Sequence, residues 1–240
     1  MKIALLGYGK MGKEIEKIAL EQNHQIVARI DNEKDWITFA EQISFADVAI
    51  EFSTPDTVVN NIYNCFNLNL PIVVGTTGWA NQKESIKATC RSKNHALLFG
   101  SNFSVGVNLF FHLNEAFAKV INNYPEYQAS MEEVHHTQKL DAPSGTAISL
   151  ADILIKEIDK LNNWQKGSSN NKSTLGITSK RIDPTPGTHT ITYISEIDEI
   201  ELKHTAKSRA GFAKGAIYAA EWILDKKGFF EFKDILFNKS

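Results

Sequence analysis

Five short apolar runs, each closed by glycine or polar residues and followed by a helix-like stretch, constrain the first half of the chain most strongly. The runs span Ile3–Leu6, Ile26–Ile30, Asp47–Phe52, Pro71–Val74 and Ala96–Phe99. Strands that are apolar on both faces are typical of a parallel sheet covered by helices. We therefore predict an α/β fold class, with residues 1–106 forming a Rossmann-like dinucleotide-binding domain.

The pattern changes in the second half, where we predict a smaller α+β domain over residues 107–209. Its expected parts are a strand over Tyr127–Val134, a helix from about Ala147, a mobile loop or lid over Asn162–Gly176, and antiparallel strands over Thr188–Ser195 and Ile200–His204. Residues 210–240 are predicted to form a helix that returns to the first domain.

The bulk properties exclude several classes of function. The formal net charge is −2 over 240 residues, so no broad attraction to nucleic acid or to an anionic membrane surface is expected. No apolar run approaches the roughly 18 residues that a membrane span requires. Cys65 and Cys90 lie outside any Cys-x-x-Cys pair, as in a reducing compartment. We expect a cytoplasmic protein.

A glycine-rich turn follows the first predicted strand. It contains Gly7, Tyr8, Gly9, Lys10, Met11 and Gly12 and matches Gly-x-Gly-x-x-Gly. A simple strand–helix turn could carry the same string. However, a strand precedes it, a helix follows it, and Asp31 closes the next strand, where an acid can bind the ribose hydroxyls of a dinucleotide. This context favours dinucleotide binding, with the phosphates at the start of the helix.

Two further polar turns follow the fourth and fifth predicted strands. They contain Gly75, Thr76, Thr77 and Gly78, and Gly100, Ser101, Asn102, Phe103 and Ser104. Ligands of open parallel sheets bind beyond the carboxyl ends of the strands, where these turns should lie. Position alone leaves ordinary turn chemistry equally open.

The segment after residue 131 carries the densest chemistry. His135 and His136 should point to opposite faces of a strand, and Lys139 follows within a turn. Ser144, as a predicted helix N-cap, together with Gly145 and Thr146 would form a carboxylate site. Adjacent histidines lack zinc-ligand spacing and no third ligand stands beside them, so we expect no metal. Two solvated loop histidines remain the simplest alternative.

The string from His135 to Ala147, which includes Lys139 and Asp141-Ala142-Pro143-Ser144-Gly145-Thr146, resembles the signature of the dihydrodipicolinate reductase family, also named 4-hydroxy-tetrahydrodipicolinate reductase. The rest of the chain agrees in order, through Gly75–Gly78, Asn102–Asn108, Gly187–His189 and His204–Gly215. The glycine loop departs from the family pattern, being one residue shorter and carrying Lys10 where the family has arginine.

The resemblance implies a Rossmann-like cofactor domain and a substrate domain whose sheet builds a homotetramer. It implies hydride transfer from NADH or NADPH to a cyclic dicarboxylate in diaminopimelate and lysine biosynthesis, with loss of the ring hydroxyl as water. His135 would be the general acid or base, assisted by Lys139. The substrate carboxylates would be held by His136, Lys139, Ser144, Gly145, Thr146 and Thr77. The cofactor would be held by Gly7–Gly12, Asp31, Gly75–Thr77 and Gly100–Phe103.

Two other functions share parts of this pattern. Another Rossmann enzyme acting on an amino acid or imine, such as an aspartate dehydrogenase, would share the first half but has no need of the string from His135 to Thr146. A non-catalytic dinucleotide sensor would lack a substrate site. For the cofactor, repulsion between Asp31 and the 2′-phosphate of NADPH is opposed by Lys10. We therefore expect NADH to serve at least as well as NADPH.

Overall fold

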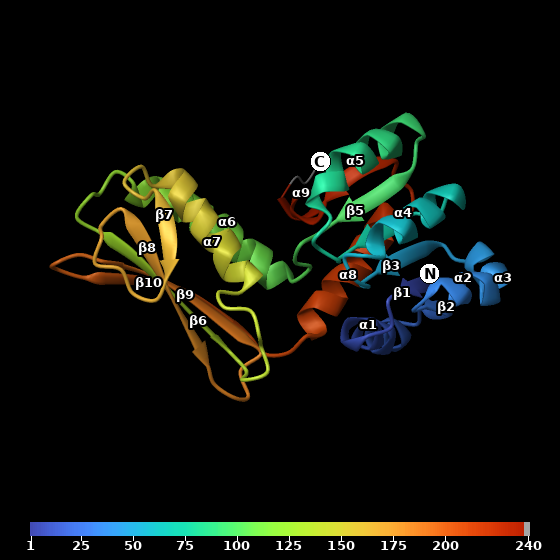
Figure 1. Cartoon of the computed structure of the whole chain (residues 1–240), viewed down its shortest axis with the longest axis horizontal. Helices are drawn as coiled ribbons and strands as arrows, with labels where there is room; N and C mark the ends of the chain where they lie inside the picture. The colour runs from blue at the N-terminus through green and yellow to red at the C-terminus, as the bar shows by residue number, and fades with distance from the viewer. Residues whose placement is uncertain (238–240) are drawn as a thin grey trace. The chain divides into compact units, whose positions relative to one another are not determined.

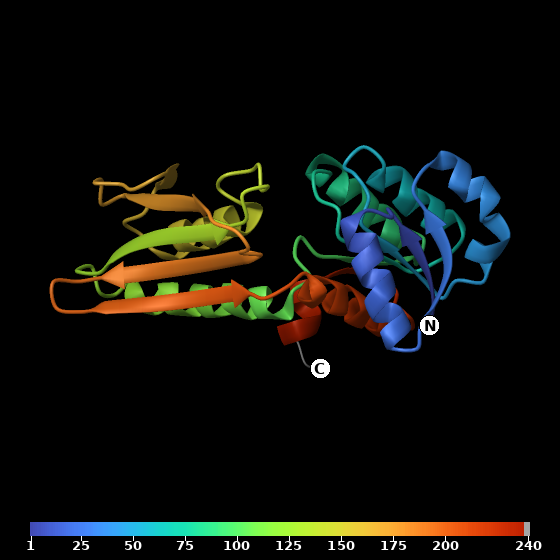
Figure 2. The ribbon, with the colours of Figure 1, turned by 90° about the horizontal axis from the view of Figure 1, so that it is seen from below.

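The computed structural model describes residues 1–237, which form two compact units. The first unit consists of Met1–Val105 and the segment from Arg209 onward, and the second of Gly106–Ser208. Figures 1 and 2 show that the chain leaves the first unit before α6 and re-enters it at α8. Each unit has its own sheet, with an apolar core on both faces of the sheet in the first unit and one apolar core in the second.

The first unit is a parallel six-stranded sheet. In spatial order its strands are β11 (Gly228–Glu231), β5 (Ala96–Phe99), β4 (Ile72–Val74), β3 (Val48–Glu51), β1 (Lys2–Leu6) and β2 (Gln25–Ile30). Successive side chains of β1 enter different cores, Ile3 and Leu5 on one face and Ala4 and Leu6 on the other. This two-sided burial explains the unbroken apolar runs of the sequence, and the predicted α/β fold class is confirmed.

Helices cover both faces of this sheet. One face packs against α1 (Lys10–Glu21) and α8 (Ala210–Ile223), and the other against α4 (Val58–Asn67) and α5 (Lys83–Ser92). The short helices α2 (Glu33–Thr38), α3 (Ala40–Ser44), η1 (Ala80–Gln82) and α9 (Phe232–Phe237) complete the unit.

The returning segment is not the single helix that the sequence pattern predicts. After α8, β11 adds a strand parallel to β5, and α9 follows it. The strand is only four residues long and half-buried, and alternation cannot be recognised over so short a run. Residues 238–240, the end of the predicted helix, lie outside the described residues.

The second unit has a mixed five-stranded sheet. Its strands, in spatial order, are β10 (Glu199–Ala206), β9 (Gly187–Ile194), β6 (Gln128–His135), β8 (Thr174–Arg181) and β7 (Asn163–Lys166). One core joins this sheet to α6 (Val105–Ile121) and α7 (Gly145–Glu157), and it includes Phe110, Leu150 and Ile177. The predicted lid over Asn162–Gly176 is wrong in part, because it contains β7 and the start of β8.

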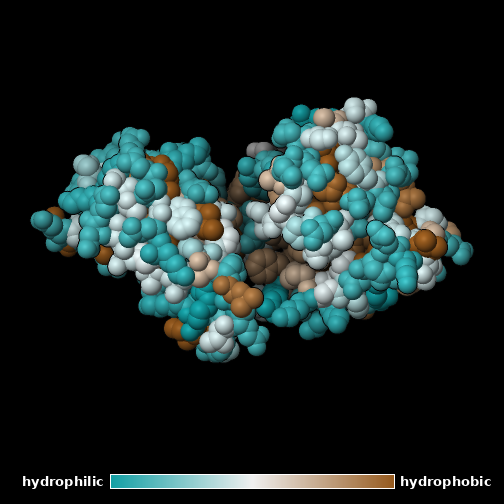
Figure 3. Space-filling model, viewed as in Figure 1, coloured by the Kyte–Doolittle hydropathy of each residue, from teal (hydrophilic) through white to brown (hydrophobic). Residues whose placement is uncertain are grey.

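The surface drawn in Figure 3 is mostly hydrophilic, with hydrophobic residues scattered over both units. Among residues 1–237, no helix combines the length and apolar character needed to cross a membrane.

Candidate active site

The glycine loop joins β1 to α1 at the carboxyl ends of the parallel strands. Gly7 has φ +88°, and a Cβ there would lie 2.3 Å from the carbonyl oxygen of Phe52. A Cβ on Gly12 would lie 2.3 Å from the carbonyl oxygen of Gly7. Only glycine therefore fits at either position, because the loop, the helix and the β3 end approach each other so closely.

Gly9 differs from these two glycines. It is the N-cap of α1 and provides no side-chain hydrogen bond to the helix, and a Cβ there would meet no described atom within 4 Å. The first turn of α1 holds Lys10, which is exposed, and Met11, which is half-buried. An uncapped helix start with open space in front of it suits a pyrophosphate. The residues present fit the dinucleotide that the motif predicts.

The turns after β4 and β5 lie on the same side of the sheet. The Gly75 N–H donates to the Glu51 carbonyl over 2.8 Å, and the Gly100 N–H donates to the Val74 carbonyl over 3.0 Å. Thr76 is buried, whereas Thr77 is exposed. The predicted cofactor loops therefore share one edge of the sheet, which we call the carboxyl edge.

The turn after β5 presents main chain and small polar groups. Ser101 is exposed, and Asn102 is half-buried with its side-chain oxygen accepting from the Ser104 N–H over 2.9 Å. Phe103 is 1% exposed, and its ring packs 4.8 Å from that of Phe232. The ring of Phe103 belongs to the core, so only the main chain of this residue could meet a cofactor.

Asp31 follows β2 and stays exposed at the carboxyl edge. One of its oxygens accepts from the Tyr8 N–H over 2.8 Å, which ties it to the glycine loop. Arg29, two residues earlier, is bound to the Glu16 carboxylate of α1, with its Nε 3.1 Å from Oε2. The structure therefore places this guanidinium against an acid.

Sequence reasoning missed a buried acid beneath these loops. Glu51 ends β3 and is fully buried, and burial raises the pKa of its carboxyl group. Its Oε1 accepts from the Ser53 N–H over 3.0 Å and from the Asn61 amide over 3.4 Å. Its position at the end of a strand, next to Phe52-Ser53-Thr54, was the available signal.

In the second unit, a single buried carboxylate organises the predicted catalytic segment. Glu133, on the central strand β6, is fully buried, and both its oxygens accept from the Ser144 N–H over 3.1 Å. The Arg181 guanidinium donates to its Oε1 over 3.4 Å. His135 Nδ1 lies 3.4 Å and His189 Nε2 3.8 Å from Oε2. We call Glu133, His135, Ser144, Arg181 and His189 the Glu133 cluster.

Strand register brings this cluster together. Glu133 and His135 are two residues apart on β6 and so share a face, while Glu133 lies opposite His189 of β9 and His135 lies opposite Arg181 of β8. Gly187 begins β9, and a Cβ there would come within 3.1 Å of His135 Nε2. The missing side chain therefore leaves room for the imidazole.

The cluster holds its acid ionised and its histidines neutral. Burial would raise the pKa of Glu133, but hydrogen bonds from the Ser144 side chain and main chain act against it, and the net shift of that pKa is downward. Burial lowers the pKa of His135, and the positive charges of Lys139 and Arg181 act in the same direction. Burial lowers the pKa of His189 to about 4. A negatively charged ligand next to His135 would raise the pKa of His135 again, because it would favour the protonated imidazole.

Ser144 connects the cluster to α7. It is the N-cap, its Oγ accepts from the Ala147 N–H over 3.2 Å, and the same atom lies 3.1 Å from His189 Nε2. Gly145 is exposed and Thr146 is half-buried in the first turn. Ser144 is thus the N-cap that the sequence predicts, and the first turn of α7 is accessible, as a carboxylate site would require.

Lys139 lies in the loop between β6 and α7. Its ammonium group donates to Asp141 over 2.8 Å, and its side chain is 24% exposed. Arg181 Nε donates to the Lys139 carbonyl over 3.1 Å, which links the Lys139 segment to the cluster. His136 is half-buried beside these residues in sequence, but it lies outside the cluster.

Glu133, His135 and His189 also have the spacing of metal ligands, since one ligand atom from each lies within 4.8 Å of the others. The sequence argument that no third ligand is near fails here, because strand pairing supplies one. The carboxylate is already occupied by Ser144 and Arg181. A divalent cation bound to Glu133 would lie close to the positively charged Arg181 guanidinium, which donates to the same carboxylate. Repulsion between these two cations opposes metal binding.

The comparisons with known proteins agree with this geometry. The profile described as Dihydrodipicolinate reductase, N-terminus, matches residues 1–103, and the one described as Dihydrodipicolinate reductase, C-terminus, matches residues 106–236. The chain belongs to the dihydrodipicolinate reductase family. The family resemblance that the sequence motifs predicted is confirmed.

Two relatives carry the same name. The 4-hydroxy-tetrahydrodipicolinate reductase of Christiangramia forsetii is 46% identical over 237 residues, which is 98% of each chain. That of Thermosipho africanus is 36% identical over 238 residues, again 98% of each chain. The match spans both units, so neither half of the chain lies outside the family.

Solved structures show the same fold. A dipicolinate-bound dihydrodipicolinate reductase from Paenisporosarcina sp. TG-14 superposes with a TM-score of 0.75 at 22% identity, covering 98% of this chain and 99% of that one. An amine dehydrogenase from Mycobacterium smegmatis reaches a TM-score of 0.60 at 9% identity, covering 98% of this chain and 95% of that one. At these identities the likeness concerns the fold alone.

Proposed function

We propose that this chain reduces 4-hydroxy-tetrahydrodipicolinate to tetrahydrodipicolinate with NADH or NADPH, as a step of diaminopimelate and lysine biosynthesis. The observation that carries the proposal is the 46% identity, over 98% of both chains, to a reductase of that name. The Glu133 cluster beside an open helix start supplies the matching chemistry, namely a proton donor next to an anion site.

The roles of the side chains follow from their surroundings. A bound nicotinamide would supply the hydride. Neutral His135 would gain a proton when the substrate carboxylates lie close, because their negative charge raises its pKa. It would then deliver this proton as the hydride adds to the ring and the ring hydroxyl leaves as water, so that one hydride and one proton are consumed for each water released. Lys139, held by Asp141, would add a second donor and a positive charge.

Substrate binding is assigned to the α7 start. The Gly145 and Thr146 N–H groups at this helix start would bind a carboxylate, with Ser144 capping the helix. Lys139 and His136 would contribute side-chain donors. Thr77, exposed in the first unit, is the further carboxylate contact that the family resemblance implies.

For the cofactor, we propose that NADH serves at least as well as NADPH. Asp31 is exposed where the adenosine ribose of a dinucleotide binds, and its carboxylate repels a 2′-phosphate. At about 4 Å and an effective dielectric near 20, that repulsion is about 4 kcal/mol per unit charge. The Arg29 guanidinium is paired with Glu16, whereas Lys10 in the glycine loop is exposed and opposes the repulsion from Asp31.

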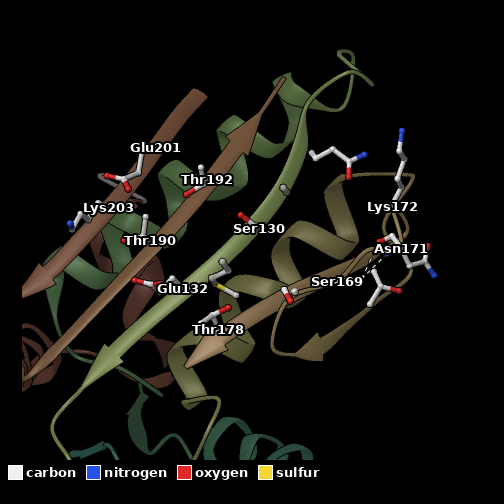
Figure 4. Close-up of a pocket in the computed structure, with 16 residues that line it drawn as sticks. Ser130, Glu132, Ser169, Asn171, Lys172, Thr178, Thr190, Thr192, Glu201 and Lys203 are labelled. Atoms are coloured by element: carbon white, nitrogen blue, oxygen red, sulfur yellow. Dashed lines mark hydrogen bonds between the residues drawn. The ribbon is translucent and has the colours of Figure 1, made fainter. Parts of the chain in front are cut away.

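We propose that copies of the chain associate through one face of the sheet in the second unit, the face that points away from α6 and α7. This face holds a cavity of about 410 Å³, lined by polar side chains that include Ser130, Thr178, Thr190, Thr192 and Glu201. Figure 4 shows them on neighbouring strands. No residue of the Glu133 cluster lines this cavity. We propose that the face joins copies of the chain into a homotetramer, and light scattering should give four times the chain mass rather than one.

The alternatives receive less support. An aspartate dehydrogenase-like enzyme has no need of the Glu133 cluster and the α7 carboxylate site together. A dinucleotide sensor needs no proton donor, whereas this chain has a buried histidine, His135, in the Glu133 cluster.

One assay tests the proposed function. Absorbance at 340 nm should fall when the chain and NADH are added to substrate made freshly from pyruvate and aspartate semialdehyde. Loss of NADH that depends on both the chain and the fresh substrate is the expected result. An unchanged signal with either cofactor, from a folded chain, would contradict the proposal.

A further inference from the structure

We propose that Glu16 sets the cofactor preference by holding Arg29 away from the position of a 2′-phosphate. This inference rests on the proposed function only in requiring that the chain binds nicotinamide dinucleotides. In this account Asp31 disfavours the phosphate, and Glu16 withholds the cation that would compensate for it.

The contact between Glu16 and Arg29 is bidentate. Arg29 Nε donates to Glu16 Oε2 over 3.1 Å, and Nη2 donates to Oε1. The Tyr8 hydroxyl donates to the same carboxylate. The Glu16 side chain is only 12% exposed, whereas that of Arg29 is 42% exposed. A fork of this kind on a half-buried acid fixes the guanidinium more firmly than a single surface ion pair would.

Tyr8 places this pair next to the adenosine site. Its N–H donates to Asp31 over 2.8 Å, and its ring centroid lies 5.6 Å from the Arg29 guanidinium. Tyr8 therefore contacts both the acid that would bind the ribose and the cation held by Glu16. Arg29 lies in β2 and Asp31 follows the strand, and both contact Tyr8, so a released Arg29 could extend toward the surroundings of Asp31.

The chemistry of the 2′-position explains why release should matter. In this fold an acid after the second strand binds the ribose hydroxyls, and an arginine nearby accommodates a 2′-phosphate. This chain has both residues within the same site, but the arginine is occupied. The Arg29 hydrogen bond lowers the pKa of Glu16, so the carboxylate stays ionised and keeps its partner at neutral pH.

The test measures binding rather than turnover. Titration calorimetry gives the dissociation constants of NADH and NADPH for the wild type, Glu16→Gln and Glu14→Gln. Glu16→Gln should improve NADPH binding relative to NADH by about tenfold, the equivalent of one charge-assisted hydrogen bond. Glu14→Gln removes the same charge from the same helix and should leave the ratio within about twofold of the wild type.

Two Arg29 variants distinguish the release of Arg29 from the simple loss of the negative charge of Glu16. In the double variant Glu16→Gln/Arg29→Gln the gain should disappear, and in Arg29→Gln alone the wild-type ratio should persist within about twofold. A gain that survives in the double variant would overturn the inference, because the missing charge alone would explain it. A tenfold loss of NADPH binding in Arg29→Gln would also overturn it, because Arg29 would already serve the phosphate.

The outcomes also separate this inference from the proposed function. An unchanged ratio in Glu16→Gln, with both cofactors bound and the melting temperature preserved, overturns the inference and leaves the reductase proposal intact. A wild-type chain that binds neither dinucleotide overturns both.

Discussion

The candidate ligand sites of the two units are built from different parts of the chain. In the first unit the carboxyl edge consists of main chain, with glycines where the loops and α1 approach too closely for a side chain. In the second unit the site consists of buried ionisable side chains gathered around Glu133. Steric fit therefore controls the first site and electrostatic balance the second, so different substitutions should damage each.

The largest expected effect on stability is in the second unit. Glu133→Ala leaves the Ser144 N–H and the Arg181 guanidinium without their carboxylate, and breaking such a buried pair costs about 3–5 kcal/mol. Glu132, the next residue, points to the opposite sheet face and pairs with Lys180 over 2.6 Å. Glu132→Ala should cost less than about 1 kcal/mol. Urea unfolding of both variants checks the difference, and equal losses would show that Glu133 is not a central partner.

A smaller loss, of about 3 kcal/mol, is expected for Gly7→Ala in the first unit. The new methyl group would overlap the Phe52 carbonyl, and φ +88° would be strained. Gly9→Ala should keep the wild-type melting temperature but weaken NADH binding, because its Cβ would point into open space before the helix start. Thermal unfolding and NADH titration of the pair measure the two effects. A stable Gly7→Ala chain would refute the steric account.

The next effect concerns ligand binding alone. Lys139→Ala should weaken binding of pyridine-2,6-dicarboxylate by at least about tenfold, since charge-assisted hydrogen bonds contribute roughly 1.5–3 kcal/mol. Lys180→Ala, which removes a lysine bound to Glu132 on the other sheet face, serves as the control and should change little. Calorimetry decides between them, and equal affinities in wild type and Lys139→Ala would remove Lys139 from the site.

The same contrast explains what sequence reasoning could predict. In the first unit, glycine is required where two backbone segments approach closely, and apolar runs are required where a strand is buried on both faces. Both features can be recognised directly in the sequence. The six-residue glycine loop and Asp31 were identified from those features. The exception is β11, whose four half-buried residues show no periodicity.

In the second unit the sequence carries weaker signals of the strands and of the site. Strands β7 and β8 escaped prediction because they contain polar residues, and β8 follows a polar turn that suggested a loop. The sequence pattern points to His135, Lys139 and Ser144 as site residues, but it gives no sign that Glu133, Arg181 and His189 gather with them. The contacts of Arg181 and His189 arise from strand register across three strands, which no local pattern records. A period-two reading of β6 would have placed Glu133 beside His135.

The most direct test is His135→Ala. We attribute dinucleotide binding to the main chain of the first unit and proton transfer to the Glu133 cluster of the second unit, so this substitution should affect only proton transfer. Removing a general acid typically costs about 10²–10⁴-fold in rate. We expect kcat with fresh substrate to fall by that factor, while the NADH dissociation constant stays within about twofold of the wild type. A kcat within a few-fold of wild type would contradict the account, since the proton would then come from another group.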